Sequence, residues 1–162
     1  MKDRTREAVF NLVGPSVKGK HAIDLFAGTG AMAIEAISRG AHSAMLIERH
    51  LPSARLVREN LATLNLTDKA TLFEADAFIW MQDKSDELPR DQPWLTFICP
   101  PYRFFRERFD DMLTIVTWFA QNSPPNSIMM VEAEIPFDFE QFASLGEWNV
   151  RTYRPAVVGK LA

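Results

Sequence analysis

The stretch His21–Gly30, with the sequence HAIDLFAGTG, decides the fold of this chain. Residues 21–26 are mostly apolar and predict a buried strand, which ends in a glycine-containing loop over residues 27–30. Residues 31–39 follow at helical spacing, and Gly40 suits the left-handed position after a helix. A strand, a glycine loop and a helix in this order predict the first unit of an α/β fold with a mainly parallel sheet.

The same alternation of apolar strands and helical stretches continues along the chain. Further strands are expected at residues 44–47, 71–73, 95–98, 128–131, 148–153 and 157–161. Helices are expected at residues 5–13, 52–64, 77–81, 109–119 and 139–143. The polar stretch 83–92 is expected to be a surface loop. Because no repeat or linker interrupts this pattern, residues 1–162 are predicted to form a single domain.

Composition restricts the functional classes that the chain can belong to. Its 47% hydrophobic and 24% charged residues are typical of a soluble globular protein. No apolar stretch approaches the ~20 residues that cross a bilayer, and no signal-peptide pattern opens the chain, so we expect a cytoplasmic protein without a membrane partner. The single cysteine excludes an intrachain disulfide, and neither it nor the three histidines show metal-ligand spacing, so no metal is expected.

The overall charge does not by itself predict nucleic-acid binding. The net charge is −3 and the isoelectric point is about 5.6. Basic residues nevertheless gather in the segments 2–6, 103–108 and 151–160, whereas acidic residues gather in 83–91. Such mixing is also typical of ordinary solvated faces, so charge alone leaves both interpretations open.

The glycine loop and an acidic residue after the second strand predict a nucleoside-containing cofactor. Gly28 and Gly30 let the backbone approach a ligand closely, and the helix that follows presents free N–H groups. Glu48 lies 18 residues after Gly30, at the end of the next strand, where a carboxylate can accept from both ribose hydroxyls. The sequence GTGAMA, residues 28–33, also matches the G-x-G-x-x-A pattern of dinucleotide-binding sites.

Two further acidic residues help to distinguish between S-adenosylmethionine and a dinucleotide as the cofactor. Asp24 precedes the glycine loop, and a carboxylate facing that loop would attract a positively charged ligand and repel a pyrophosphate. Asp76 follows the third strand, where its carboxylate can accept from an adenine amino group, with the Ala77 N–H beside it. S-adenosylmethionine carries a sulfonium and an ammonium, so the pattern favours it over a dinucleotide. The alternative is that Asp24 and Asp76 only cap the turns that follow them.

The turn Cys99-Pro100-Pro101-Tyr102 predicts the place where the target group binds. Two prolines remove backbone donors and fix the preceding residue in an extended conformation, so the carbonyls are free to accept. Such a turn suits a planar amino group. Tyr102 is expected to be a stacking platform for an extruded base, with core packing as the alternative.

On these residues the chain resembles the class I methyltransferases, and more closely the bacterial small-subunit (16S) rRNA guanine-N2 methyltransferases, the RsmD family. The resemblance covers nearly the whole chain, and the arginine-rich opening segment is its family-specific part. The residues that carry it are Asp3–Asn11 (DRTREAVFN), Asp24–Gly30 (DLFAGTG), Glu35, Ala36, Ser38–Ala41 (SRGA), Glu48, Asn60, Asp76 and the Pro-Pro-Tyr turn.

The resemblance implies a Rossmann-like α/β fold. Its seven-stranded sheet would be mainly parallel with the last strand antiparallel, and helices would cover both faces. It also implies methyl transfer from S-adenosylmethionine to the exocyclic N2 amine of a guanine. The substrate would be ribosomal RNA or a small-subunit assembly particle, and we expect the protein to be a monomer.

The resemblance also assigns roles to individual residues. Cofactor-binding residues would be Asp24, Phe26, Ala27, Gly28, Gly30, Glu48, Arg49, Asp76, Ala77 and Cys99. Catalytic residues that receive the target base would be Cys99, Pro100, Pro101 and Tyr102. RNA-binding residues would be Arg4, Arg6, Asn11, Arg103 and Arg106, with the helix at 5–13 as a cap or an RNA-contact element.

The sequence departs from the family pattern at two places. Cys99 stands where the family usually has Asp, or Asn in related amine methyltransferases, and residues 153–157 lack an expected Tyr-Gly pair. A thiol is a weak acceptor, and burial raises its pKa. Cys99 is therefore interpreted in three ways: a small buried residue beside the catalytic Pro100 carbonyl, a mark of a weakened or non-catalytic S-adenosylmethionine- or RNA-binding homologue, or a sign of another substrate or of redox sensitivity. An amine methyltransferase acting on DNA adenine or protein glutamine is the other enzymatic alternative.

Overall fold

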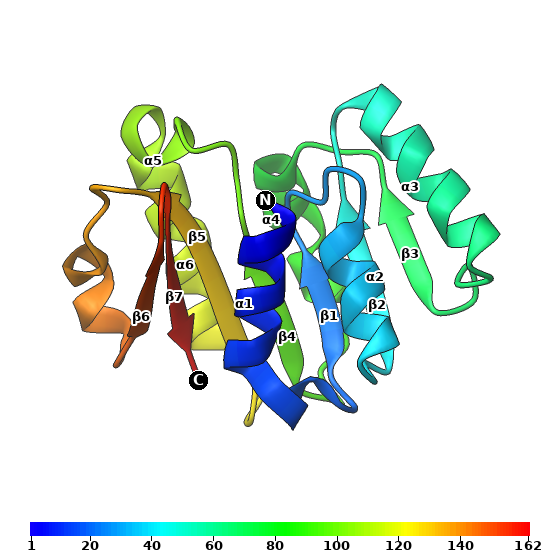
Figure 1. The fold of residues 1–162 in the computed structure, drawn as a ribbon, viewed down its shortest axis with the longest axis horizontal. Coiled ribbons are helices and arrows are strands. Elements are labelled where there is room, and N and C mark those ends of the chain that lie inside the picture. Colours follow the sequence, from blue (N-terminus) through cyan, green and yellow to red (C-terminus); the bar gives the residue numbers. More distant parts are fainter.

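Seven strands form one mixed sheet in the order β3-β2-β1-β4-β5-β7-β6 in the computed structural model, which describes residues 1–162. The strands are β1 His21–Asp24, β2 Ser43–Ile47, β3 Ala70–Phe73, β4 Trp94–Ile98, β5 Ile128–Glu134, β6 Asn149–Tyr153 and β7 Ala156–Leu161. Strands β1 to β5 pair in parallel, and β7 is antiparallel to both β5 and β6. The predicted seven-stranded sheet with an antiparallel last strand is confirmed (Figure 1).

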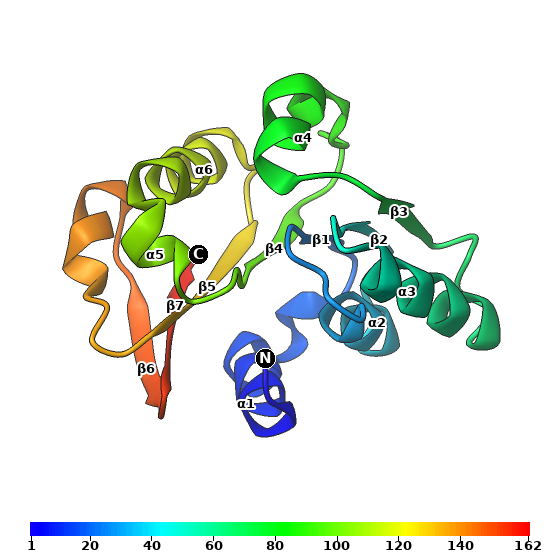
Figure 2. The ribbon, with the colours of Figure 1, turned by 90° about the horizontal axis from the view of Figure 1, so that it is seen from above.

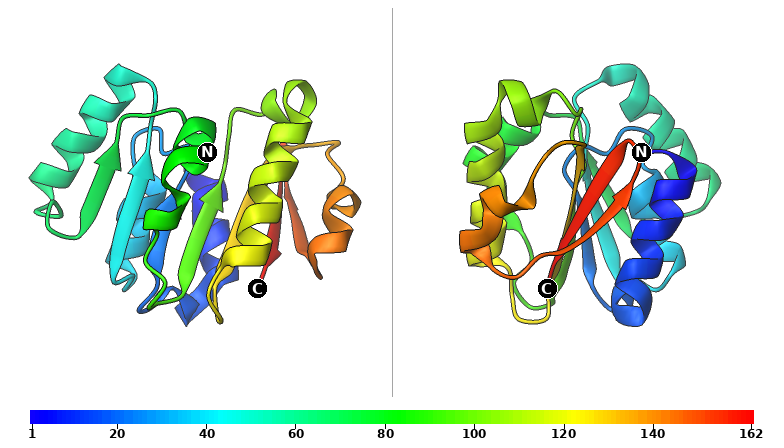
Figure 3. Two further views of the ribbon diagram at one scale, coloured as in Figure 1. Left: turned by 180° about the vertical axis from the view of Figure 1, so that it is seen from behind. Right: turned by 60° about the vertical axis from the view of Figure 1, so that its left-hand side comes forward.

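Helices cover both faces of this sheet, as predicted. The helices are α1 Asp3–Val13, α2 Ala31–Ser38, α3 Leu51–Thr63, α4 Ala77–Lys84, α5 Phe104–Glu107 and α6 Phe109–Asn122, and the 3-10 segments are η1 Gly14–Val17, η2 Ser85–Glu87 and η3 Phe139–Leu145. Figure 2 shows α1, α2 and α3 on one face and α4, α5 and α6 on the other. The two views of Figure 3 show the same layers from behind and from the side.

Each face of the sheet packs its own hydrophobic core, because successive side chains of a strand point to opposite faces. In β4, Leu95 and Phe97 belong to the core under α1 and α2, whereas Trp94 and Ile98 belong to the core under α4 and α6. The N-terminal helix is part of this packing, since the rings of Phe10 and Phe97 lie 5.6 Å apart and Phe10 is fully buried.

The structure differs from the sequence prediction after β3 and after β4. Helix α4 extends to Lys84 and η2 follows it, so the predicted loop 83–92 is partly helical. Leu88 within it is buried, and the Trp94 Nε1–H donates to the Pro89 carbonyl at 2.7 Å, which draws this polar segment onto the sheet. The short helix α5, which the sequence did not predict, directly follows the Pro-Pro turn.

The carboxyl ends of the five parallel strands share one edge of the sheet. The order of the strands reverses between β1 and β4, and ligands of open α/β sheets bind outside the carboxyl ends at such a point. The N-terminus of the chain lies at this same edge (Figure 1). None of the helices has the length and apolar character that a membrane span requires.

Candidate active site

Two adjoining cavities open at the carboxyl edge of the sheet. The first, of about 530 Å³, lies between the loop after β1, the end of β2, the start of α4 and the turn after β4. The second, of about 430 Å³, lies between that turn and the residues Lys2, Glu132 and Pro155. Cys99, Pro100 and Pro101 line both cavities, so the turn is their common wall. A hollow of about 840 Å³ at the opposite edge contains none of the predicted site residues.

The structure gathers most of the predicted site residues around these cavities. The predicted cofactor residues that line the first cavity are Phe26, Gly28, Glu48, Arg49, Asp76, Ala77 and Cys99. Three others, Asp24, Ala27 and Gly30, do not line it. Tyr102 lines the second cavity.

The two glycines of the loop serve different purposes. Gly28 has φ of 58° and faces open space, so its conformation is what requires glycine there. Gly30 has φ of 86° and precedes α2, and a Cβ on it would lie 3.2 Å from Leu46 Cδ2 and 3.4 Å from Val57 Cγ2. Gly30 therefore allows the helix to pack closely on the sheet, while Gly28 leaves the cavity open.

Glu48 crosses from the end of β2 to the glycine loop. Its Oε1 accepts from the Gly28 N–H at 2.8 Å, and its Oε2 accepts from the His50 N–H at 3.0 Å. Each carboxylate oxygen can accept a further hydrogen bond, so the group can also bind the two hydroxyls of a ribose. The same carboxylate thus shapes the loop and faces the cavity.

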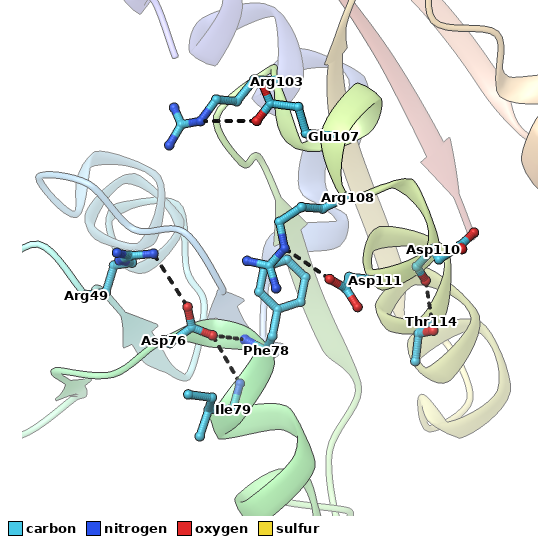
Figure 4. A network of polar contacts seen from close by, with 10 residues as sticks. All are labelled: Arg49, Asp76, Phe78, Ile79, Arg103, Glu107, Arg108, Asp110, Asp111 and Thr114. Atoms are coloured by element: carbon cyan, nitrogen blue, oxygen red, sulfur yellow. Dashed lines mark hydrogen bonds and ion pairs between the residues drawn. The ribbon is translucent and has the colours of Figure 1, made fainter.

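Asp76 caps the helix that closes the far side of the first cavity. Its Oδ1 accepts from the Phe78 and Ile79 N–H groups at 2.9 and 3.1 Å, which is the N-cap geometry (Figure 4). Its Oδ2 lies 3.7 Å from Arg49 Nη1. Asp76 therefore caps the helix, and its carboxylate also lines the cavity beside the Ala77 N–H, so capping is not its only possible role.

Phe78 and Phe104, which are not among the predicted site residues, complete this wall together with the predicted Phe26. The rings of Phe26 and Phe104 are 6.0 Å apart, and Phe78 lies 5.9 Å from each of them. The Arg108 guanidinium lies 3.9 Å from the Phe78 ring centroid and donates from Nε to Asp111 at 3.0 Å (Figure 4). Phe104 could not be predicted from the sequence, because α5, which brings it to the site, is a helix of only four residues.

Asp24 lies beneath the glycine loop instead of along the cavity wall. It is 1% exposed, and neither carboxylate oxygen has a hydrogen-bond partner within the protein. Burial raises the pKa of this carboxyl to about 7, and the nearby Glu48 carboxylate also raises it. Asp24 is thus a group that exchanges its proton near neutral pH next to the first cavity.

The Pro-Pro turn brings a thiol, a phenol and a buried carboxylate together. Burial and the neighbouring carboxylates of Glu132 and Asp24 raise the pKa of the Cys99 thiol well above its ordinary value, so the thiol stays protonated. The Tyr102 O–H donates to Glu132 Oε1 at 2.6 Å. Partial burial and this hydrogen bond raise the pKa of Tyr102, which therefore remains a donor.

Three of the five predicted RNA-binding residues have acidic partners on the surface. Arg6 donates to Asp3 at 2.9 Å, Arg103 lies 3.9 Å from Glu107 (Figure 4), and Arg106 lies 3.3 Å from Glu134. Arg4 and Asn11 are exposed on α1. Arg103 also lines the first cavity, so it connects the site with the surface around it.

The sequence matches a known family over nearly its whole length. The family model described as Conserved hypothetical protein 95 matches residues 1–157. The chain is also 30% identical over 163 residues to ribosomal RNA small subunit methyltransferase D of Escherichia coli (strain K12), across 99% of this chain and 74% of that protein. This chain belongs to the RsmD family. The predicted family is therefore confirmed.

This chain also resembles a second relative in sequence and a solved RNA methyltransferase in fold. It is 40% identical over 75 residues to the YlbH protein of Bacillus subtilis (strain 168), a match that covers 46% of this chain and 41% of YlbH. Its fold resembles that of an RNA methyltransferase from Salinibacter ruber, solved in complex with S-adenosyl-L-homocysteine, with a TM-score of 0.67 at 14% identity over 99% of this chain and 90% of that one. The fold is that of a class I methyltransferase, as predicted.

Proposed function

We propose that this protein transfers a methyl group from S-adenosylmethionine to the N2 amine of a guanine in small-subunit ribosomal RNA. The observation that carries the proposal is the pair of adjoining cavities that share the Cys99–Pro101 turn. A cofactor in the first cavity and a base in the second would meet at this turn. Membership of the RsmD family supports ribosomal RNA as the substrate class.

The residues around the first cavity fit S-adenosylmethionine. Its volume of about 530 Å³ lies within the usual range for small-ligand sites. Glu48 can bind a ribose, and Asp76 can accept from an adenine amino group, with the Ala77 N–H and the Phe78 and Phe104 rings lining the same cavity.

The chain's own residues would then orient the amine and exclude water. S-adenosylmethionine supplies, when bound, an electrophilic methyl group on a positively charged sulfur. The Pro100 carbonyl can accept a hydrogen bond from the target amine, which localises its lone pair and aims it toward the first cavity. The Tyr102 ring, held by Glu132, would stack on the base. Cys99 contributes little as an acceptor because a protonated thiol is a weak one.

Under this proposal residues 1–162 act as one domain and as a monomer. Arg4, Arg6, Asn11, Arg103 and Arg106 would contact RNA phosphates around the site, and the acidic partners of three of them would have to be displaced. A ribosomal RNA substrate implies that the protein works in the cytoplasm. The second candidate function is a non-catalytic S-adenosylmethionine- or RNA-binding role, which the weak acceptor Cys99 favours.

Calorimetry and methyl transfer together test both functions. We expect the protein to bind S-adenosylmethionine and to methylate small-subunit particles that lack the modification, and digestion with mass spectrometry should show N2-methylguanosine. Binding of the cofactor without transfer would support the non-catalytic role. Absence of any cofactor binding would refute both candidates, and a different methylated nucleoside would refute the guanine-N2 assignment alone.

A further inference from the structure

The second cavity contains a carboxylate that no step of the proposed reaction uses. Glu132 belongs to β5, is 4% exposed and lines the cavity together with Tyr102 and the turn. A buried carboxylate is costly unless it is well hydrogen-bonded or meets a ligand. The one side-chain hydrogen bond that it receives comes from the Tyr102 O–H at 2.6 Å, to Oε1. Oε2 and the second lone pair of Oε1 are left to accept from a ligand in the cavity.

The sheet register places Glu132 directly beside the turn. In the parallel pairing of β4 with β5, Ile98 lies opposite Val131, so Cys99 and Glu132 are the next residues on the two strands. Cys99 packs against the core on the α1 side of the sheet, and side chains alternate along β5, so Glu132 points to that same side. A base stacked on Tyr102 would therefore have its edge at Glu132.

A carboxylate selects among bases by the donors that they present. The Watson–Crick edge of guanine carries two adjacent donors, N1–H and N2–H, which a carboxylate can accept together. Adenine has an acceptor at N1, which a carboxylate repels. Extruded bases are recognised through hydrogen bonds to this edge and through stacking.

We infer that Glu132 recognises the target guanine by accepting hydrogen bonds from its N1–H and N2–H groups. This inference rests on the proposed function. The Tyr102 O–H fixes the carboxylate from one side, and the base occupies its free side. Glu132 thereby supplies, from the neighbouring strand, the strong acceptor that Cys99 lacks. The role makes Glu132 a residue that determines specificity, in addition to the Pro100 carbonyl that orients the amine.

The substitution Glu132→Gln tests this role, because it keeps the size of the side chain. The probes are short single-stranded RNAs that carry one guanine or, in its place, one 2-aminopurine, which keeps the amine but has an acceptor at N1. We expect the native protein to bind the guanine RNA about 10- to 100-fold more tightly. A glutamine can donate to N1, so Glu132→Gln should abolish this preference. The affinity for S-adenosylhomocysteine should not change, because Glu132 does not line the first cavity.

A matched control and a second variant complete the test. Glu134→Gln changes a carboxylate two residues along the same strand, one that pairs with Arg106 at the surface, and should leave the guanine preference intact. Tyr102→Phe keeps the ring and the buried carboxylate but removes the orienting O–H, and it should reduce the preference. If Glu132→Gln does not fold, Tyr102→Phe decides the question.

The outcomes separate this inference from the function on which it rests. An unchanged ratio of guanine to 2-aminopurine affinity in the folded variants, with S-adenosylhomocysteine still bound, would overturn the inference and leave the proposed function standing. A native protein that neither binds S-adenosylhomocysteine nor methylates small-subunit particles would overturn the proposed function, and the inference with it.

Discussion

The Glu48 carboxylate accepts from the Gly28 N–H at 2.8 Å and so joins the end of β2 to the loop after β1. This hydrogen bond holds the loop against the end of β2. The carboxylate lines the first cavity at the same time, so the shape of the loop and the recognition of a ribose depend on one side chain. Substitutions there should separate the two roles.

Replacing Glu48 by Gln should weaken cofactor binding without unfolding the protein. The amide oxygen can still accept from the Gly28 N–H, but the amide nitrogen cannot accept from the His50 N–H, and the charge that strengthens hydrogen bonds to ribose hydroxyls is lost. We expect the affinity for S-adenosylhomocysteine to fall about 10- to 100-fold in calorimetry. Glu35→Gln, on α2 beside Arg39, is the control and should bind normally. Equal affinity in the two variants would contradict the role of Glu48.

The two loop glycines should respond differently to alanine. At Gly30 the left-handed backbone and the contact of a Cβ with Leu46 add together, so Gly30→Ala should lower the free energy of unfolding by about 2–4 kcal/mol. At Gly28 only the backbone is strained, and Gly28→Ala should cost about 1–2 kcal/mol. Chemical denaturation measures both values. A larger loss at Gly28 would show that the packing at Gly30 is not the limiting contact.

Replacing Cys99 should show whether the thiol is itself needed. We predict that Cys99→Asn keeps the affinity for S-adenosylmethionine and preserves or raises methyl transfer, because an amide oxygen is a better acceptor than a protonated thiol. Cys99→Asp should be less stable, since it adds a third carboxylate beside Asp24 and Glu132. Transfer assays and thermal unfolding measure these effects. A clear loss of transfer in Cys99→Asn would assign a function to the thiol.

Asp24 should make the stability of the protein depend on pH. Its pKa is raised from 3.8 to about 7, so between these values the folded state binds more protons than the unfolded state. Its contribution therefore lowers the free energy of unfolding as the pH rises through this window, by roughly 4 kcal/mol in total.

The variant Asp24→Asn isolates this contribution. The amide does not titrate, so the difference in unfolding free energy between variant and native protein should grow in favour of the variant as the pH rises from about 4 to 7. Denaturation at a series of pH values measures it. A difference that stays constant over the window would show that Asp24 keeps an ordinary pKa.

The sequence predicted those parts of the fold that depend on local pattern. Hydrophobic runs located the strands, and the glycine loop with Glu48 located the first cavity. It could not predict α5 or the contact of Arg108 with Phe78, because both depend on how distant segments pack. Glu132 was missed for the same reason. Nothing in the sequence VEAE distinguishes a buried carboxylate on β5 from an exposed one, and only the strand register brings it to Cys99.

Helix α1 is anchored to the sheet close to the Pro-Pro turn, because Phe10 packs on Phe97. Phe97, on β4, lies two residues before Cys99. The Lys160 Nζ, on β7, also donates to the Leu12 carbonyl of α1 at 3.3 Å. These two contacts hold α1 against the sheet. An RNA bound at Arg4 would therefore lie at a constant separation from the turn.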